Sequence, residues 1–397
     1  MQPTISARDL NTWAGYLLDY SLDGIKPDDV VMIKGEPITW PLMAALQDKI
    51  VAAGAIADLC LVPPDNDRGR VWGAAMARFG APDQIARVPE WHRRRYEAMT
   101  KYIEILGAER PDLYANLPEA GIKAIVRADE PFKNIRLAKP WLLTLFPTQG
   151  FADLEGLTLE EYTRVIVRAS VTDPRLLEAV EEDIYRLMSQ TRHVRIITAC
   201  PRTGRTLELG MSIAGQRIIK CTGKRNFPDG EVYTSPDANS VAGEIYLDLP
   251  VLYSGVTIRG IYLRLEAGWI CEYAAEEGLE TLRSIIETDD GSHRLGEVAL
   301  GMNNGLERAL KHPLFVEKVG GTLHIAIGSS YKQSYVDDPE SPEGKARLEE
   351  LARQGACNTS AQHVDIVSDF RPGGAGRAVW LDDVQLALRD TIWVVPR

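Results

Sequence analysis

The chain has 397 residues, of which 45% are apolar and 25% charged, and its formal net charge is −11 at pH 7. This composition is typical of a folded globular protein rather than a disordered or fibrous one, and the length predicts two domains. The acidic balance argues against nucleic acid or an anionic membrane as a partner, because phosphate binding relies on clustered Lys and Arg.

Cysteine usage and the N-terminal sequence bear on the compartment. The five cysteines are widely spaced, with no Cys-x-x-Cys pair, and we expect reduced core thiols. The first residues lack a basic segment followed by an apolar stretch, and no run of about 18 apolar residues occurs. We therefore expect a cytoplasmic protein.

The first part of the chain alternates between predicted helices and short apolar strands. In chain order these are a helix at 7–22, a strand at 30–33, a helix at 42–53, and strands at 58–62, 123–127 and 141–146. Alternation of this kind predicts a doubly wound α/β domain with a mainly parallel sheet, assigned to residues 1–187. It carries no dinucleotide-binding or P-loop motif, so we interpret it as a scaffold.

The pattern changes after a predicted helical segment at 160–187. Short segments with partial two-residue alternation follow, separated by Gly, Pro, Asn and Asp. Strands are predicted at 193–198, 206–211, 216–220, 244–249 and 256–264, a helix at 273–286, and an exposed acidic loop at 337–344. Residues 188–397 are therefore predicted to form a mixed α+β domain.

Two histidines in this second domain lie in predicted strands. His363 and Asp365 are two residues apart, which places imidazole and carboxylate on one strand face, about 7 Å apart at the backbone. His324 alternates with Leu323 and Ile325, so it faces away from the apolar side. Either histidine alone is more often a satisfied polar residue than a ligand.

Two glutamates strengthen the metal interpretation. Glu231 directly follows the turn-forming residues Pro228, Asp229 and Gly230, which direct its side chain. Glu297 is the single acid in an apolar run, and a buried carboxylate needs a cation near it. The structural alternatives are a capped turn for Glu231 and a salt bridge to Arg294 or Lys311 for Glu297.

Four segments, taken in order, resemble the thermophilic-type metallo-aminopeptidases, the family of aminopeptidases T and S. They are residues 226–236, 295–297, 323–331 and 363–365, and the first is the most specific. The resemblance covers the second half of the chain and reaches back to residues 141–172. It implies an aminopeptidase that removes the N-terminal residue of short peptides, with an N-terminal α/β domain, a metal-bearing C-terminal domain and a homodimeric state.

The resemblance also implies two divalent ions, zinc or cobalt, and a set of ligands. The six ligand positions are Glu231, Glu297, His324, Tyr331, His363 and Asp365. Glu231 and Tyr331 are expected to act in catalysis, Tyr331 as a ligand or as a hydrogen-bond donor to the oxyanion. Asp365 or a glutamate is expected to bridge the ions. The sequence does not rank the candidate general bases Asp229, Glu287, Asp289 and Asp369. Lys224 and Arg225 could neutralise the transition-state oxygen, but exposed turn charges explain them at least as well.

Two rival interpretations stay open at this point. His324, His363 and Asp365 also match the two-His, one-carboxylate set of a mononuclear Fe(II) oxygenase, and hydroxypyridine ring-opening dioxygenases are similar to this peptidase family in their second domain. Glu231, Glu297 and Tyr331 would have no role around a single iron. The second rival is a non-enzymatic protein with a structural metal, although structural zinc prefers a closed set of Cys and His ligands.

Overall fold

The computed structural model describes residues 3–63, 72–111, 113, 117–253, 256–371 and 376–396. The chain forms two compact units. Unit 1 is Met1–Pro174 with Gly223–Pro228, and unit 2 is Arg175–Thr222 with Asp229–Arg397. The sequence placed the domain boundary after residue 187, which lies within helix α9 (Pro174–Gln190).

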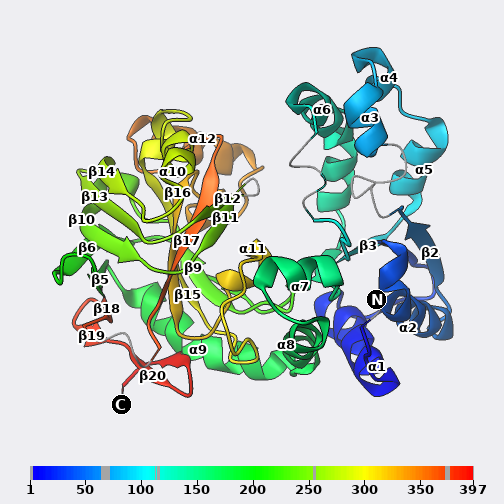
Figure 1. Ribbon diagram of the computed structural model, residues 1–397, viewed down its shortest axis with the longest axis horizontal. Helices are drawn as coiled ribbons and strands as arrows, with labels where there is room; N and C mark the ends of the chain where they lie inside the picture. The colour runs from blue at the N-terminus through cyan, green and yellow to red at the C-terminus, as the bar shows by residue number, and fades with distance from the viewer. Residues whose placement is uncertain are drawn as a thin grey trace. The chain divides into compact units, whose positions relative to one another are not determined.

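Unit 1 is built on a parallel sheet, as its alternating sequence pattern predicted (Figure 1). The strand order is β2-β1-β3-β4-β8, and the neighbouring strands run parallel. The strands are β1 (Val30–Gly35), β2 (Ile56–Leu61), β3 (Lys101–Leu106), β4 (Trp141–Leu145) and β8 (Asn226–Phe227). The last of these comes from the segment that returns to unit 1 after unit 2 has begun.

The helices of unit 1 include one segment that the sequence assigned wrongly. They are α1 (Ala7–Gly15), continued by a π-helical turn at Tyr16–Ser21, then α2 (Trp40–Ala52), α3 (Ala74–Phe79), α4 (Pro82–Ala86), α5 (Glu90–Ala98), α6 (Glu119–Leu137), α7 (Gln149–Glu155) and α8 (Leu159–Val171). Residues 123–127, predicted as a strand, belong to α6, which packs against α3, α4 and α5. Its buried residues Ile125 and Phe132 are seven apart, a helical period that a five-residue window does not reveal.

Unit 2 contains two larger antiparallel sheets. The seven-stranded sheet has the order β14-β13-β10-β6-β5-β18-β19, and the five-stranded sheet has the order β17-β16-β15-β9-β7. Their strands are β5 (His193–Ala199), β6 (Thr206–Ser212), β7 (Ile219–Cys221), β9 (Glu231–Thr234), β10 (Ala242–Leu247), β13 (Ile261–Glu266), β14 (Trp269–Ala274), β15 (Leu295–Gly301), β16 (Thr322–Gly328), β17 (His363–Asp369), β18 (Ala378–Leu381) and β19 (Val384–Gln385). Two small hairpins pair β11 (Val251–Tyr253) with β12 (Val256–Ile258) and β20 (Ala387–Arg389) with β21 (Ile392–Val394).

One hydrophobic cluster joins the two sheets of unit 2. It includes Ile196 and Leu263 from the seven-stranded sheet and Ile325 and Ile366 from the five-stranded sheet. Packing of this kind leaves the other face of the five-stranded sheet for polar side chains. The mixed α+β prediction for this half is therefore confirmed.

The helices of unit 2 are α9, α10 (Leu279–Ile286), α11 (Pro313–Val316) and α12 (Pro342–Arg353). The predicted helix at 273–286 is too long, because β14 continues to Ala274 and Gly278, at φ 73°, immediately precedes the helix. The predicted strand at 256–264 is two strands separated by a turn. Within the described residues, no helix combines the length and the apolar character needed to cross a membrane.

Candidate metal centre

Four neighbouring strands of the five-stranded sheet carry the predicted ligands on one face. On β17, Val364 and Ile366 join the hydrophobic cluster, so the alternating His363 and Asp365 face the other way. The same alternation on β16 turns His324 away from the core residues that flank it. Five of the six predicted ligands come from these strands, and Tyr331 follows the end of β16 (Figure 1).

Small side chains leave room between the ligands. Ala326 lies directly between Glu297 on β15 and Asp365 on β17 in the strand register. Ala299 lies between Tyr233 on β9 and His324 on β16. Both alanines are buried, and their single methyl groups form a shallow floor beneath the longer side chains.

Two glycines direct the two glutamates. A β-bulge between Leu295 and Glu297 lets Leu295 enter the core while Glu297 turns to the opposite face. A Cβ on the intervening Gly296 would come within 2.2 Å of the Ser329 carbonyl oxygen, so the bulge requires glycine. Gly230, at φ 144°, has the same role before Glu231, because a side chain there would be strained and would meet Asn303.

The ligands form two groups of three that share Glu297. In one, donor atoms of Glu231, Glu297 and His324 all lie within 4.8 Å of one another, and in the other those of Glu297, His363 and Asp365 do. Glu297 Oε1 is 3.6 Å from His324 Nε2, and Glu297 Oε2 is 3.0 Å from His363 Nε2. The two oxygens of one carboxylate therefore face two different imidazoles.

Hydrogen bonds prepare His363 to be a ligand. Its Nδ1 lies 2.7 Å from the carbonyl oxygen of Ser329, an acceptor, so this nitrogen carries the proton. The other nitrogen, Nε2, faces Glu297 and, at 3.4 Å, Asp365. A backbone carbonyl that fixes the tautomer in this way is the usual support of a metal-ligating histidine.

An excess of negative charge controls the protonation of both histidines. Burial lowers the pKa of His324, but Glu297, Glu231 and Asp365 more than offset this and raise it to about 9. For His363, burial is outweighed by Asp365 and Glu297, which raise the pKa to about 11. Without metal, both imidazoles therefore hold protons where divalent cations would bind.

Tyr331 forms part of the mouth of the site. Its ring centroid lies 4.6 Å from that of His363 and 5.1 Å from that of Tyr233. Tyr331 is 39% exposed, whereas Glu297 and His324 are almost fully buried. Burial, followed by the charges of Glu297 and Asp365, raises the pKa of the phenol, which stays neutral at physiological pH.

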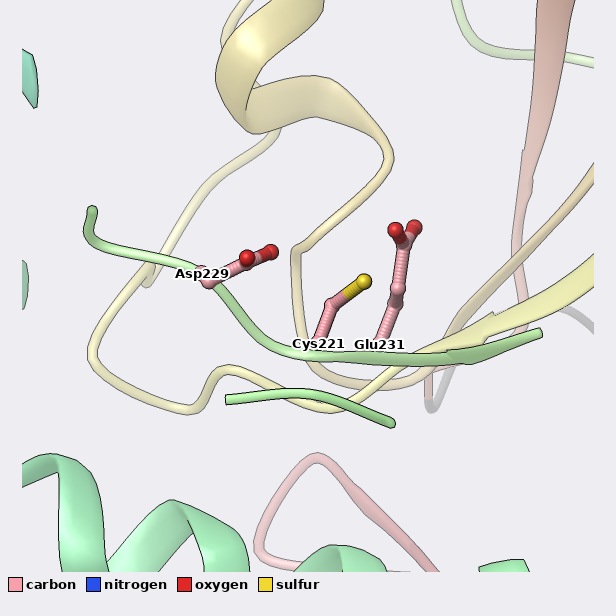
Figure 2. Close-up of side chains that lie close together, drawn as sticks. All are labelled: Cys221, Asp229 and Glu231. Atoms are coloured by element: carbon pink, nitrogen blue, oxygen red, sulfur yellow. The ribbon is translucent and has the colours of Figure 1, made fainter. Parts of the chain in front are cut away.

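A third group, Cys221, Asp229 and Glu231, already has a cation. Figure 2 shows Glu231 and Cys221 rising from neighbouring backbone segments and Asp229 pointing across toward them. The Lys318 ammonium contacts Glu231 Oε1 and lies 3.5 Å from Asp229 Oδ1 and 2.8 Å from Glu317 Oε1. Lys318 is buried, and its charge neutralises part of the acidic cluster.

Sequence reasoning did not single out four residues around the site. Glu317 has a donor atom within 4.8 Å of donors of His324 and Asp365, and Lys318 and Cys221 flank Glu231. Glu181 on α9 is fully buried, and burial, followed by the charges of Asp229 and Glu231, raises its pKa to about 10, so this carboxyl stays protonated. A signal existed for Glu317 and Lys318, since both are charged residues in an apolar stretch, as Glu297 is.

The alternatives for the other charged residues are now resolved. Among the general-base candidates, Asp229 lies at the cluster, whereas Glu287 accepts from Tyr273, Asp289 caps the turn at Ser292, and Asp369 pairs with Arg371. The guanidinium of Arg294, one of the two partners considered for Glu297, donates instead to Gly355 and Asn239. In unit 1, Lys224 pairs with Asp23, and Arg225 lies over the ring of Trp141.

These residues fit divalent metal ions by three criteria. Carboxylates with two imidazoles are donors that suit zinc, cobalt or manganese. Glu231 Oε2, His324 Nδ1 and Asp365 Oδ1 are buried atoms without a hydrogen-bond partner. The cluster also holds more carboxylates than cationic side chains: Lys318 contacts Asp229, Glu231 and Glu317, and the groups that Glu231 and Glu317 belong to also contain Glu297 and Asp365.

Sequence comparisons find relatives over one third of the chain. Aminopeptidase T of Thermus aquaticus is 36% identical over 144 residues, which are 35% of this chain and 33% of the relative. Aminopeptidase 2 of Geobacillus stearothermophilus is 35% identical over 147 residues, again 33% of its length. The matched stretch thus spans about a third of each of these relatives.

Two solved structures share the fold over nearly the whole chain. AmpT from Thermus thermophilus superposes with a TM-score of 0.74 at 22% identity, covering 98% of this chain and 99% of that one. The 2,5-dihydroxypyridine dioxygenase of Pseudomonas putida KT2440 superposes with a TM-score of 0.55 at 14% identity, covering 99% of both. Residues 6–371 match the thermophilic metalloprotease family M29, and the chain therefore belongs to that family.

Proposed function

We propose that this protein is a metal-dependent aminopeptidase that hydrolyses the N-terminal peptide bond of short peptides at a centre of two divalent ions. The observation that carries the proposal is the sharing of Glu297 between two donor groups, with one of its oxygens toward each histidine. Glu231 and His324 would hold one ion and His363 and Asp365 the other, and Glu297 would belong to both sets of ligands. Bound ions of this kind activate water as a nucleophile and polarise the scissile carbonyl.

The charge balance supports two ions rather than one. Five carboxylates and one ammonium leave four negative charges when every carboxyl group is ionised and both histidines are neutral ligands. Two divalent cations balance that excess, whereas a single Fe(II) would leave half of it buried without compensation. Zinc or cobalt fits the donor set, and manganese fits it as well.

The chain's own residues have distinct tasks in this mechanism. Glu231 keeps Oε1 on Lys318 and presents Oε2, which has no hydrogen-bond partner, to the reaction side as ligand and proton acceptor. Tyr331, held between His363 and Tyr233, has a neutral hydroxyl that can donate a hydrogen bond to the developing oxyanion. Substrate would approach past exposed Tyr331 and half-buried His363 and Asp365, which are more accessible than Glu231, Glu297 and His324.

Purified protein tests the proposal in three measurements. We expect about two divalent ions per chain by elemental analysis, release of leucine from a chromogenic leucyl amide, and no oxygen uptake with hydroxypyridines. The exposed-acid variant Glu340→Gln is the matched control and should keep both metal and activity. One bound ion together with hydroxypyridine-dependent oxygen consumption would instead establish the dioxygenase alternative.

Further parts of the proposal rest on the family resemblance. We propose a homodimer located in the cytoplasm, with zinc or cobalt as the metal. Sedimentation of the purified protein tests the dimer, and metal analysis after purification without added metal tests the ion.

A further inference from the structure

An open pocket in unit 1 shares no residue with the metal centre. Its volume is about 420 Å³, within the range of roughly 300–1,000 Å³ that is usual for small-molecule sites. It lies among α4, α5 and α6 (Figure 1) and is lined by seven apolar residues and two arginines. The lining includes Ala86, Val88, Ala124 and Phe132, and the arginines are Arg93 and Arg127.

The aromatic wall of the pocket is fixed by packing. Phe132 is 1% exposed, and it belongs to the hydrophobic cluster of this part of unit 1. Its ring contacts three other rings at centroid distances between 4.7 and 5.8 Å, those of Trp72, His92 and Tyr96. Trp72 also donates a hydrogen bond of 3.0 Å to the carbonyl oxygen of Ile85, which ties α4 to these rings. A pocket that is already formed loses little entropy when a ligand binds.

Arg93 differs from the two arginines that follow it in α5. Arg94 lies 3.0 Å from Glu90 and forms an ion pair along the helix. Arg95 forms an ion pair of 2.6 Å with Asp58. The Arg93 guanidinium has no acidic partner among the described residues, so its charge stays available to a ligand.

Both arginines of the pocket lack a counter-charge from the protein. The Arg93 guanidinium lies over the face of Phe132, 5.6 Å from the ring centroid. Within the part of the chain that the structure describes, the Arg127 guanidinium likewise has no ion pair, and none of the lining residues is acidic. Guanidinium groups are strong partners for carboxylates, and here they lie beside apolar surface. This combination indicates a ligand that carries both an anionic and an apolar group.

A proline within α6 adds a hydrogen-bond acceptor to the pocket. Pro131 has no backbone N–H, so the carbonyl of Arg127, four residues earlier, loses its usual helical donor. Arg127 and Pro131 both line the pocket. The carbonyl can therefore accept a hydrogen bond from an N–H group of a ligand.

We propose that this pocket binds the C-terminal residue of a peptide that ends in an apolar amino acid. Its carboxylate would contact Arg93 and Arg127, its amide N–H would donate to the Arg127 carbonyl, and its side chain would lie against Phe132. A free amino acid has the same carboxylate, but its ammonium group would be repelled by the two guanidinium groups. The proposal goes beyond the peptidase function and does not depend on the metal centre.

The test is the binding of N-acetyl-phenylalanine to the full-length protein, measured by calorimetry. This probe has the carboxylate, the amide N–H and an aromatic side chain, and its blocked N-terminus prevents aminopeptidase cleavage. We expect Arg93→Gln and Arg127→Gln each to weaken its binding at least about tenfold, because each removes a charged hydrogen-bond donor. N-acetyl-phenylalaninamide, which has no carboxylate, and free phenylalanine should both bind at least about tenfold more weakly than the probe.

Arg94→Gln is the matched control. It removes the same charge from the same helix, but Arg94 does not line the pocket and pairs with Glu90. Its affinity for N-acetyl-phenylalanine should equal that of the unsubstituted protein. All three arginines are exposed, and urea unfolding verifies that each variant is folded.

Four results would overturn the proposal. The first is the absence of binding by the unsubstituted protein, and the second is unchanged affinity in both Arg93→Gln and Arg127→Gln. The third is equal weakening by Arg94→Gln, which would assign the effect to the general charge of the helix. The fourth is tighter binding of free phenylalanine than of N-acetyl-phenylalanine, which would assign the pocket to an amino acid. None of these results bears on the metal centre, so the peptidase function is tested separately.

Discussion

Each unit of this protein buries a cluster of charged side chains, and the two clusters differ in their balance. In unit 1, Glu104 lies 2.7 Å from Lys34 Nζ and 3.1 Å from Arg136 Nη1, and Tyr102 donates to it. In unit 2, five carboxylates lie in the cluster, and the ammonium of Lys318 contacts three of them, Asp229, Glu231 and Glu317. A buried cluster whose carboxylate has its own cations can be explained by architecture, whereas one with more carboxylates than cations requires cations from solution.

The pKa values express the same contrast. Burial raises the pKa of Glu104, but the charges of Lys34 and Arg136 outweigh it, so the net shift is downward and the carboxylate stays ionised. In unit 2, burial raises the pKa of Asp229 to about 7 against the opposing charge of Lys318, and that of Glu317 rises as well. Four substitutions or conditions test this contrast, and the size of the expected change decreases from each one to the next.

Glu297→Gln should have the largest effect, because it removes the carboxylate common to both donor groups. We expect loss of one or both ions and a fall in peptidase kcat/KM of about 10³-fold or more, equivalent to roughly 4 kcal/mol. Glu104→Gln, the matched change in unit 1, should leave the ion count unchanged and lower only the free energy of unfolding. If Glu297→Gln and Glu104→Gln bound the same number of ions, the two clusters would not differ in their need for metal.

Lys318→Met should destabilise the metal-free protein by about 3 kcal/mol, since it leaves several buried carboxylates without a counter-charge. Lys34→Met should cost less, because Arg136 still contacts Glu104. Urea unfolding of both variants measures the difference. If Lys34→Met proved equally costly, the two clusters would be alike in their dependence on lysine.

The stability of the metal-free protein should fall as pH rises. His324 and His363 have folded pKa values of about 9 and about 11, above the ordinary 6.5, so the folded state binds more protons than the unfolded state between these limits. Their contribution is complete below pH 6.5 and is lost as pH rises through 9 and 11. We expect the free energy of unfolding to fall between pH 6.5 and 9, and saturating Zn²⁺ to remove this dependence. A flat profile in the metal-free protein would contradict this expectation.

Glu181→Met should have the smallest effect and the opposite sign. Glu181 is fully buried with neither oxygen hydrogen-bonded, so an apolar side chain of similar size should stabilise the fold by about 1 kcal/mol. Because the folded pKa is about 10 and the ordinary value is 4.5, the cost of Glu181 grows as pH rises through this range. The gain should therefore be larger at pH 8 than at pH 5, with no change in bound metal.

Local patterns were sufficient to find most of the site. The period of a β-strand is two, so the spacing of His363 and Asp365 placed them together, and the structure sets their side chains 3.4 Å apart. The cost of an unpaired carboxylate singled out Glu297. Its bulge was not visible, because regular alternation from Leu295 would send both side chains to one face.

Features that depend on contacts distant in sequence were missed. Lys318 meets Asp229 and Glu231 only because a loop folds back over β9, and no short window contains that information. In unit 1, the parallel sheet was recognised from its apolar strands, but β3 was missed. Lys101 and Glu104 make that strand look polar, although each is buried in an ion pair.

The two alanines beneath the ligands have a consequence for reading function in related sequences. Ala326 occupies the register position between Glu297 and Asp365, so a valine or leucine there would place added bulk between these two carboxylates while leaving every ligand unchanged. A homologue with all six donors and a bulky residue at this position would be catalytically silent. A comparison of metal ligands between related sequences should therefore include the small residues that lie between the ligands.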